Sequence, residues 1–263
     1  ELIEVMRIRS ARGMHLAVDR TRPFRAVHHT SSVVAICGGG VDLKPGELSL
    51  AHRGVLFLDE ITEFRKDVLE SLRQPLEDGS ITVSRASGTV TYPASVLLVA
   101  ACNPCPCGYL GDVVKSCSCS PSDIDRYAKK LSGPILDRID IHLQVPRLTP
   151  EELLELDGDA ENSLSVKKRV MAARSIQLER WYPFGIKYNA ELSEKLIKKH
   201  LGLTREAKAF IKSVGASFNL TGRGLSRVLK IARTIADLAG EKNVRDAHLA
   251  EALTYRGGTV LER

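Results

Sequence analysis

The first half of the chain alternates short apolar runs with a helical pattern. Residues 54–59 read Gly-Val-Leu-Phe-Leu-Asp and residues 95–101 read Ser-Val-Leu-Leu-Val-Ala-Ala, and both runs are typical of fully buried strands. Between them, apolar residues from Ile61 to Leu76 recur at helical spacing, and Pro75 and Gly79 are expected to end that helix. A strand, a crossover and a second strand predict a parallel sheet.

Two other segments of the first half lack a helical pattern. Residues 81–85 and 89–92 flank Ala-Ser-Gly, and this arrangement predicts a β-hairpin over residues 81–92. Residues 22–53 contain Gly-Gly-Gly at 38–40 and Pro-Gly at 45–46, so we expect an irregular, loop-rich insertion. Long loops in compact domains are usually functional or disordered.

After Val145 the pattern becomes helical. Pro146, Pro150 and the acidic residues 151–161 predict a linker or an exposed helix. Helical spacing then predicts helices at 190–200, 204–218, 221–238 and 244–255, the second with Thr204 as its N-cap. We therefore expect three parts, which are an α/β core over residues 1–145, a linker and helix over 146–185, and a helical domain over 186–263.

The positive charge is unevenly distributed along the 263 residues, whose net charge is +6. Residues 1–145 contain 17 Lys and Arg against 17 Asp and Glu, whereas residues 146–263 contain 21 against 15. The whole excess therefore lies in the second part, which favours a nucleic acid or another anionic partner. A solvated basic face is the alternative interpretation.

The sequence shows no sign of a membrane or secretory protein. No apolar run reaches the roughly 20 residues that a membrane span needs, and there is no signal-peptide pattern. Because the chain begins at Glu1 rather than at Met, we interpret it as part of a longer protein. Five of the six cysteines fall within residues 102–119, which favours metal or redox chemistry in a cytoplasmic protein over a disulfide scaffold.

Asp59 and Glu60 end the first apolar run, at the carboxyl edge of a parallel strand, where α/β sheets bind ligands. In nucleoside triphosphatases the first acid holds Mg²⁺ on the β- and γ-phosphates, and the second polarises the attacking water. The alternative is a strand that runs into a helix whose first turn favours acids. Asn103, just past the second strand, could reach the γ-phosphate or the water, or could be a turn residue before Pro104.

Arg138 is a further candidate, in the sequence Leu-Asp-Arg-Ile-Asp at residues 136–140. An arginine at a subunit edge can stabilise the charge on a phosphoryl group that is transferred in the neighbouring subunit. A salt bridge with Asp137 or Asp140 is the alternative.

The clustered cysteines form two C-x-C pairs separated by nine residues, with Cys105 and Cys107 in the first pair and Cys117 and Cys119 in the second. Four thiolates in one loop can close a tetrahedral site, and sulfur ligands without histidine favour Zn²⁺ or an iron–sulfur centre. A small structural loop favours zinc, and a set of reduced, partly buried thiols is the alternative. We expect Cys37 to be a small buried residue and Cys102 to belong to the core at the strand end, with Cys102 as a fifth candidate ligand. The histidines of the first half, His28, His29, His52 and His142, are expected to be polar packing residues rather than metal ligands.

Eight segments carry motifs that become specific in combination. They are Arg-Pro-Phe-Arg-Ala (22–26), His-His-Thr (28–30), Pro-Gly-Glu-Leu-Ser-Leu-Ala-His (45–52), Gly-Val-Leu-Phe-Leu-Asp-Glu (54–60), Leu-Arg-Gln-Pro-Leu-Glu-Asp-Gly (72–79), Asn-Pro-Cys-Pro-Cys-Gly-Tyr (103–109), Ser-Gly-Pro-Ile-Leu-Asp-Arg-Ile-Asp (132–140) and Ala-Arg-Thr-Ile-Ala-Asp-Leu (232–238). Together they resemble the bacterial ComM/YifB family of magnesium-chelatase-like AAA+ proteins over nearly the whole chain. The resemblance implies an α/β fold of AAA+ type, with a parallel sheet, flanking helices and an incomplete N-terminal part. A C-terminal helical lid like that of magnesium chelatase would follow.

The resemblance implies roles for the residues singled out above. Asp59 and Glu60 resemble the Walker B pair, and Asn103 resembles the sensor-1 residue. Arg138 resembles the arginine finger, which acts on the nucleotide of the neighbouring subunit. The implied cofactors are ATP and Mg²⁺, with zinc as a further candidate at the cysteines.

The third predicted helix of the lid carries another implied nucleotide contact. Arg223 resembles the sensor-2 arginine, which reaches the γ-phosphate of its own subunit, and Arg227 is the nearby alternative. Both lie with Lys230 and Arg233 on one side of that helix. A solvated basic face is the alternative interpretation of this side.

Two segments look like the pore loops of this clade of AAA+ proteins. The segment 22–53 resembles the insertion that breaks the second helix, and the hairpin at 81–92 resembles the hairpin that precedes sensor 1. In a ring both would face the central channel and could track a phosphate backbone. The basic residues implied are Arg22, Arg25, Lys44, Arg53 and Arg85; exposed loop charges without a ligand are the alternative.

One motif of the family does not occur between Glu1 and Arg263. The family requires G-x-x-x-x-G-K-[ST] shortly upstream of Glu1, and the Gly38–Gly40 run followed by Lys44 has neither the Gly-Lys core nor a following helix. Without the backbone N–H groups and lysine of that loop, most of the grip on the phosphates is lost. The family's N-terminal Lon-protease-like domain is also absent. We therefore expect these 263 residues to bind nucleotide weakly or not at all, and assign the ATPase activity to the whole protein.

The resemblance implies a motor that couples ATP hydrolysis to DNA remodelling, as branch migration or helicase activity in natural transformation and recombination. The implied partners are ATP, single-stranded or branched DNA, and further copies of the chain in a hexameric ring, with no membrane. The alternative is a magnesium-chelatase-type ATPase that remodels a protein partner during metal insertion into a porphyrin. Another alternative is a non-hydrolysing scaffold, against which the intact Asp59, Glu60 and Arg138 argue.

Overall fold

The computed structural model describes residues 1–14, 18–86, 88–112, 114–131, 133–149, 161–214 and 221–256. These residues separate into two compact units, Glu1–Ile139 and Asp140–Arg263. The acidic linker expected at 151–161 and the end of the helix expected at 204–218 fall mostly outside the described residues. None of the described helices is both long enough and apolar enough to cross a membrane.

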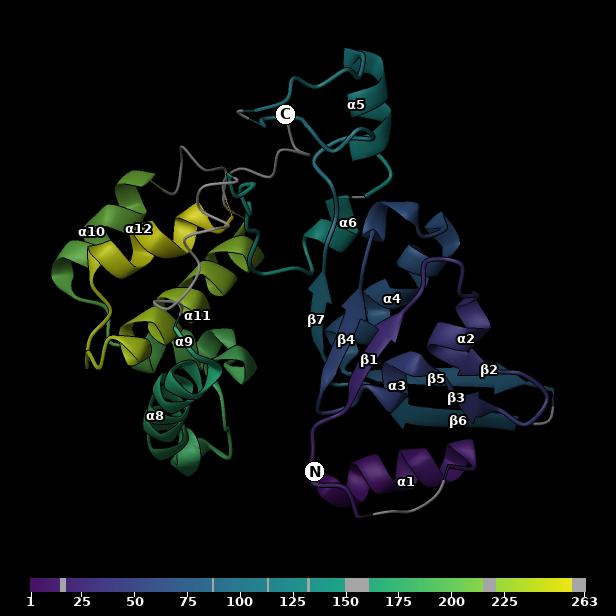
Figure 1. Cartoon of the computed structure of the whole chain (residues 1–263). Helices are drawn as coiled ribbons and strands as arrows, with labels where there is room; N and C mark the ends of the chain where they lie inside the picture. Colours follow the sequence, from purple (N-terminus) through teal and green to yellow (C-terminus); the bar gives the residue numbers. More distant parts are fainter. Residues whose placement is uncertain are drawn as a thin grey trace. The chain divides into compact units, whose positions relative to one another are not determined.

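The first unit mixes short strands with helices (Figure 1). Its elements are α1 (Leu2–Arg12), β1 (Phe24–Val27), α2 (Val33–Cys37), β2 (Gly38–Gly39), β3 (Lys44–Pro45), α3 (Glu47–Leu50), β4 (Val55–Leu58), η1 (Ile61–Glu63), α4 (Lys66–Asp78), β5 (Ser80–Arg85), β6 (Gly88–Pro93), β7 (Leu97–Ala100), α5 (Pro121–Ala128) and α6 (Gly133–Leu136). The described elements of the second unit are helical, and they are α8 (Ser163–Trp181), η2 (Tyr182–Phe184), η3 (Asn189–Glu191), α9 (Glu194–His200), α10 (Arg205–Val214), α11 (Gly222–Leu238) and α12 (Asp246–Thr254).

A three-stranded parallel sheet in the order β1-β4-β7 forms the centre of the first unit. The central strand β4 places Leu58 opposite Val27 of β1 and opposite Ala100 of β7. Leu56 and Leu58 are fully buried, and a slip of one residue would expose both, so they hold the register of β4. The parallel sheet, the flanking helices and the helical C-terminal region are confirmed, and the three strands end level at one carboxyl edge.

The expectation that β7 is fully buried is wrong. Leu97 is 62% exposed and Val99 is 40% exposed. The apolar run does form a strand, but β7 lies at an edge of the described sheet, where it pairs with β4. A continuous apolar run predicts a strand. Whether both faces of that strand are buried depends on which other elements pack against them.

The helix after β4 begins later than predicted and continues past Pro75, whereas its predicted end at Gly79 is confirmed. Residues 61–63 form the short η1, and α4 runs from Lys66 to Asp78 with Pro75 inside it. Gly79 ends α4 in the left-handed conformation, with φ 65°. Because Pro75 has no N–H group, the carbonyl of Ser71 loses its donor within the helix, and the Cys37 Sγ lies 3.9 Å from that oxygen. Cys37 is buried as predicted, and its burial raises the pKa of the thiol.

The prediction that residues 22–53 are irregular is wrong. Phe24–Val27 forms β1 of the central sheet, and the helices α2 and α3 follow it. Between these helices, Gly38–Pro45 carries the antiparallel pair of β2 and β3. Local pattern could not reveal β1, because Arg25 interrupts its four residues and Phe24 is 63% exposed; the pairing with β4 makes it a strand.

The hairpin predicted at 81–92 forms as β5 and β6 and packs against the hairpin of β2 and β3. The Tyr92 hydroxyl donates to the Leu43 carbonyl at 2.8 Å, and a side chain at Gly39 would meet Val83 at 3.6 Å. Lys44 of β3 and Arg85 of β5 therefore lie on neighbouring hairpins (Figure 1).

The second unit has its own apolar core. Trp181, Leu201, Val228 and Leu249 are completely or almost completely buried, and helices form in all four predicted stretches. The Thr204 hydroxyl accepts a hydrogen bond from the backbone N–H of Ala207 at 3.2 Å, which confirms the predicted N-cap.

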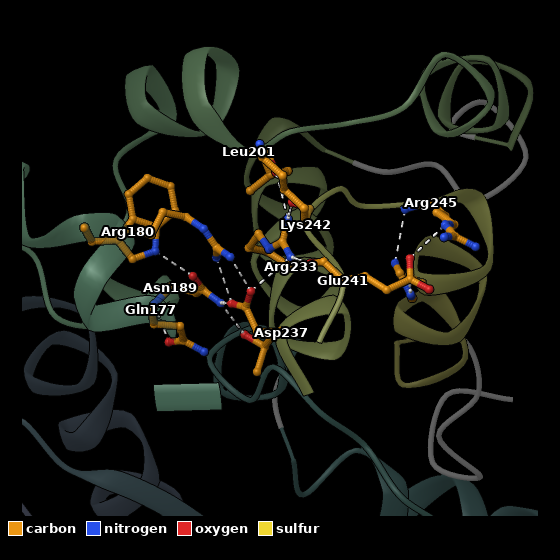
Figure 2. Close-up of polar contacts among 12 residues, drawn as sticks. Gln177, Arg180, Asn189, Leu201, Arg233, Asp237, Glu241, Lys242 and Arg245 are labelled. Atoms are coloured by element: carbon orange, nitrogen blue, oxygen red, sulfur yellow. Dashed lines mark hydrogen bonds and ion pairs between the residues drawn. The ribbon is translucent and has the colours of Figure 1, made fainter. Parts of the chain in front are cut away.

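Arg233 lies at the centre of a buried polar cluster in the second unit (Figure 2). Its side chain is 1% exposed, lies 2.9 Å from the Asp237 carboxylate, and donates to the carbonyls of Leu201, Glu241 and Lys242. A solvated basic face is therefore wrong for Arg233, although Arg223 of the same helix is exposed. The buried charge is tolerated because one carboxylate and three carbonyls surround it.

Asp237 joins several elements of this unit (Figure 2). Its side chain is fully buried and accepts two hydrogen bonds from Arg180 of α8, at 2.7 and 3.0 Å. It also accepts from the Asn189 amide at 2.9 Å, while the Asn189 oxygen accepts from the Trp181 indole at 2.8 Å. The cluster therefore fastens α8 and η3 to α11.

Asp237→Asn is expected to lower the free energy of unfolding of the second unit by about 3–5 kcal/mol, because it leaves the buried Arg233 without its counter-charge. Urea unfolding monitored by Trp181 fluorescence measures the loss. Asp246→Asn, at the exposed start of α12, is the matched control and should cost less than about 1 kcal/mol. Equal costs for the two variants would show that the cluster contributes nothing beyond a surface charge.

Candidate active site

Asp59 and Glu60 follow the end of β4 and lie beside the segment after β7 that carries Asn103. The Ala101 N–H donates to the Leu58 carbonyl at 3.0 Å, and the Ile61 N–H donates to the Ala101 carbonyl at 2.9 Å. These bonds hold the residues after β4 against the residues after β7. Glu60 and Asn103 consequently line one cavity at the carboxyl edge of the sheet.

Glu60 has an unusual backbone conformation. Its φ of 50° and ψ of 49° are left-handed, which costs a residue other than glycine roughly 1–2 kcal/mol. The Asp59 carboxylate accepts a hydrogen bond from the Glu60 N–H at 2.9 Å and so stabilises the turn. Strained residues of this kind cluster at functional sites. The turn directs Glu60 into the cavity, whereas Asp59 is exposed and is not among the residues that line it.

The cavity has a volume of about 610 Å³ and walls from three places in the first unit. The strand ends contribute Glu60 and Asn103, and the loop after β7 contributes Cys119. The third wall is α5, which contributes Arg126, together with Lys130 just beyond the end of that helix. Glu63 and Asp123 line the cavity as well, so three carboxylates and one amide lie beside two cationic side chains, a mixture that suits an anionic ligand with a bound cation.

The wall formed by α5 was not predicted. Tyr127 is buried beneath it, and its hydroxyl lies 2.7 Å from the Thr62 hydroxyl, which fastens α5 to η1. Lys130 lies 3.1 Å from Glu63. Burial raises the pKa of the Tyr127 hydroxyl. A spacing of three or four residues, typical of one face of a helix, relates Asp123, Arg126, Tyr127 and Lys130. This spacing was the signal in the sequence from which their proximity could have been predicted.

His29, which was expected to be a polar packing residue, is a second neighbour of Glu60. Its Nδ1 lies 3.6 Å from the Glu60 carboxylate, and its ring is tilted against that of His28 with centroids 4.2 Å apart. The segment after β1 therefore also reaches the candidate site. His52 is a packing residue as expected, because it is 3% exposed and burial lowers its pKa.

Arg138 is not among the residues that line the cavity with Glu60. It follows α6, is 16% exposed and pairs with Glu77 of α4. Its Nε is buried without a hydrogen-bond partner among the described residues. The structure thus gives Arg138 a partner that neither alternative from the sequence had named, at a position remote in sequence.

Arg223 and Arg227 both lie in the second unit, near the start of α11. Arg223 is exposed, and the Arg227 Nε lies 3.5 Å from the Asp140 carboxylate. One further nitrogen of Arg227, Nη1, is buried without a hydrogen-bond partner among the described residues.

The five basic residues expected in pore loops occupy different settings, and the Arg53 Nε lies 3.1 Å from the Glu4 carboxylate. Arg25 lies within β1 and pairs with Glu47 at 2.5 Å, so its expected place in a loop is wrong. Arg22 precedes β1 and donates to the Arg53 carbonyl at 2.7 Å. Lys44 pairs with Asp42 at 3.1 Å, whereas Arg85, at the exposed end of β5, has no hydrogen bond or ion pair among the described residues.

The structure brings together the four predicted thiols, which we call the cysteine cluster: Cys105, Cys107, Cys117 and Cys119. Their sulfur atoms all lie within 4.8 Å of one another, and three of the separations are 3.4, 3.5 and 3.6 Å. Hydrogen bonds from the backbone N–H groups of Tyr109 and Ser118 lower the pKa of Cys107 to about 5, and burial raises the pKa of Cys119 to about 12. Cys102 is exposed and outside the cluster, so its expected place in the core is wrong.

Comparison with known families supports one relationship over both units. The family model for magnesium chelatase, subunit ChlI, matches residues 1–153, and the model for the C-terminal part of that subunit matches residues 160–256. The chain is 46% identical over 239 residues to competence protein ComM of Haemophilus influenzae, covering 90% of this chain and 45% of that protein.

Other relatives extend the same pattern. The chain is 43% identical over 238 residues to the uncharacterized protein YifB of Escherichia coli, covering 90% of this chain and 46% of YifB. It is 24% identical over 147 residues to the magnesium-chelatase 38 kDa subunit of Cereibacter sphaeroides, covering 54% of this chain and 40% of that subunit. The chain spans about half the length of the curated relatives it matches.

Proposed function

This chain belongs to the ComM/YifB family of magnesium-chelatase-like AAA+ ATPases, and from that premise we propose that the whole protein is an ATP-driven motor that remodels DNA. The remodelling would be branch migration or unwinding during natural transformation and recombination. The observation that carries the ATPase assignment is the meeting of Glu60 and Asn103 in one cavity at the carboxyl edge of the sheet. The proposal places the protein in the cytoplasm, where clustered thiols stay reduced.

Each of the candidate residues has a separate task in this proposal. Asp59 holds Mg²⁺ through water, and Glu60 orients and polarises the water that attacks the γ-phosphate. Asn103 contacts that water or the γ-phosphate. Arg223, with Arg227 as the alternative, contacts the nucleotide from the helical lid.

The described residues fit such a ligand. Exposed carboxylate oxygens are the donors that Mg²⁺ prefers, and Asp59 and Glu60 supply them at the edge of the sheet. Arg126 and Lys130 face the same cavity and suit the negative charge of phosphates. When bound, Mg²⁺ neutralises charge on the β- and γ-phosphates.

A phosphate-binding loop upstream of Glu1 completes the proposed site in the whole protein. It would supply the backbone N–H groups and the lysine that grip the β- and γ-phosphates. We accordingly propose that residues 1–263 alone bind nucleotide weakly and do not turn it over, and that turnover requires the whole protein in a ring, which we propose to be hexameric. Light scattering with ATP measures the number of subunits.

The DNA part of the proposal rests on the two neighbouring hairpins. Lys44 and Arg85 present two positive charges close to each other, and both are exposed. Cations on adjacent loops can follow a phosphate backbone without reading its sequence. Arg22 already donates to a carbonyl and Arg25 to an acid within the first unit, so the proposal rests on Lys44 and Arg85 instead.

Lys44→Ala with Arg85→Ala in the whole protein should abolish most of the stimulation of ATP turnover by forked or single-stranded DNA, and leave turnover without DNA unchanged. Each lost phosphate contact should lower the slope of log affinity against log salt by roughly one. Lys66→Ala, which removes an exposed charge at the start of α4, is the matched control. Undiminished stimulation in the double variant would exclude these hairpins as the DNA contact.

The runner-up is a magnesium-chelatase-type motor that remodels a protein partner during metal insertion, and a relative at 24% identity is named a magnesium-chelatase subunit. The same turnover assay separates the two proposals. Stimulation by a protein partner and by no form of DNA would favour the runner-up. The higher identity to ComM and YifB supports the first proposal.

A further inference from the structure

The cysteine cluster lies in a segment whose described part has little regular structure. Residues 101–120 form no helix or strand in their described part, and Cys105 is the one residue there that is buried. A segment of this length without an apolar core of its own usually needs a crosslink or a metal ion. The segment nevertheless folds back on itself, so that its two C-x-C pairs lie next to each other.

The spacing of the sulfur atoms indicates how they are joined. Tetrahedral zinc at about 2.3 Å from each sulfur places neighbouring sulfurs about 3.8 Å apart. A disulfide requires about 2.05 Å. The separations between the sulfurs of Cys105, Cys107 and Cys117, 3.4–3.6 Å, lie near the zinc value and far from the disulfide value. The four sulfurs, with that of Cys119 included, all lie within 4.8 Å of one another.

Backbone N–H groups point at two of the sulfurs, those of Cys107 and Cys117. The Cys119 N–H points at the Cys117 sulfur, 3.4 Å away, and N–H groups of Tyr109 and Ser118 point at Cys107. Gly108 follows Cys107 with φ 82°, a conformation that glycine adopts without strain and that turns the chain back over the sulfur. Donors directed at sulfur stabilise its negative form, which is the form that binds metals.

The ligand set narrows the choice of ion. Four sulfur ligands without histidine, carboxylate or an open position are typical of a closed structural site, and zinc is the usual occupant. A catalytic zinc would need a free position for water, which four thiolates do not leave. The cluster is therefore suited to holding structure together rather than to chemistry.

We propose that the cysteine cluster binds one structural Zn²⁺ as four thiolates. The ion holds the loop that carries both Asn103 and Cys119, and these two residues line the candidate active site. Zinc thereby positions one wall of the cavity and the start of α5. The link from zinc to turnover rests on the proposed function, whereas zinc binding itself does not.

Elemental analysis of the whole protein, purified in reductant without chelator, tests the binding. We expect about one zinc per chain, and tetrahedral thiolate absorption when cobalt replaces it. Cys105→Ser and Cys117→Ser should each lose most of the metal, whereas the matched control Cys102→Ser, which changes an exposed thiol outside the cluster, should keep it. Circular dichroism verifies that the variants fold, and chelation of the unaltered protein should lower its Tm without any substitution.

Three results would overturn the proposal. They are zinc at background level, iron with visible charge-transfer absorption in its place, and equal metal loss in Cys102→Ser. Because Glu60→Gln leaves the cysteine cluster intact, that variant should keep one zinc per chain while losing turnover. A protein that binds zinc but hydrolyses no ATP would therefore contradict the proposed function and leave this inference standing.

Discussion

Glu60→Gln in the whole protein is expected to lower ATP turnover by about 100-fold to 10,000-fold, the range that a positioned general base contributes. Glutamine keeps the length of the side chain and bears a similar cost of the left-handed backbone at this position. It removes the negative charge that polarises the attacking water. The wall of the cavity stays in place, so nucleotide binding should change little.

Phosphate release at saturating ATP measures this loss, and a fluorescent nucleotide measures the affinity. Glu179→Gln, on the exposed side of α8, is the control for a change of charge elsewhere and should match the unaltered protein. A loss of affinity together with turnover would show that Glu60 contributes to binding in the ground state. Unchanged turnover would remove Glu60 from the reaction.

Arg138→Ala is expected to lower turnover by about 1,000-fold or more, as loss of an arginine finger does. Arg138 pairs with Glu77 in its own chain, and one of its nitrogens is buried without a partner among the described residues. In a ring its guanidinium would stabilise the transition state on the neighbouring subunit. Arg138→Lys should recover little, because lysine lacks the planar fork of donors.

Two controls separate this role from a structural one. Glu77→Gln disrupts the same ion pair and keeps the arginine, so it should retain most of the turnover. Mixing Arg138→Ala subunits with Glu60→Gln subunits should restore activity, because some interfaces then combine an intact Glu60 with an intact Arg138. A mixture as inactive as either variant alone would exclude action between subunits.

The central sheet shows how far pattern alone can reach. The apolar runs before Asp59 and before Asn103 predicted two parallel strands, and the structure confirms them as β4 and β7. The meeting of the two strand ends followed from their direction. The burial of β7 did not, because exposure of Leu97 depends on its edge position.

Charged residues were the least predictable from pattern. The charged Arg25 interrupts the apolar pattern of β1, so the segment was expected to be a loop. Its partner Glu47 lies 22 residues away in the sequence, and local pattern could not reveal that pair. A solvated basic face was one interpretation of the side of the helix that carries Arg233. In the structure Arg233 is buried, and Asp237 and three carbonyls are its partners. Asp237 lies one turn further along α11, whereas the carbonyls come from other segments.

The sequence by itself determined the strands β4 and β7, the hairpin of β5 and β6, the helices of the second unit, the acid pair at a strand end and the two C-x-C pairs, because each depends on neighbours a few residues away. Only the tertiary structure decided the left-handed turn at Glu60, the wall that α5 adds to the cavity and the partner of Arg138. Those features arise from contacts between distant residues, such as the bond between Thr62 and Tyr127 across 65 positions. The periodicity of a sequence indicates which side of a helix or strand is apolar. Which residues pack against that side depends on the whole fold.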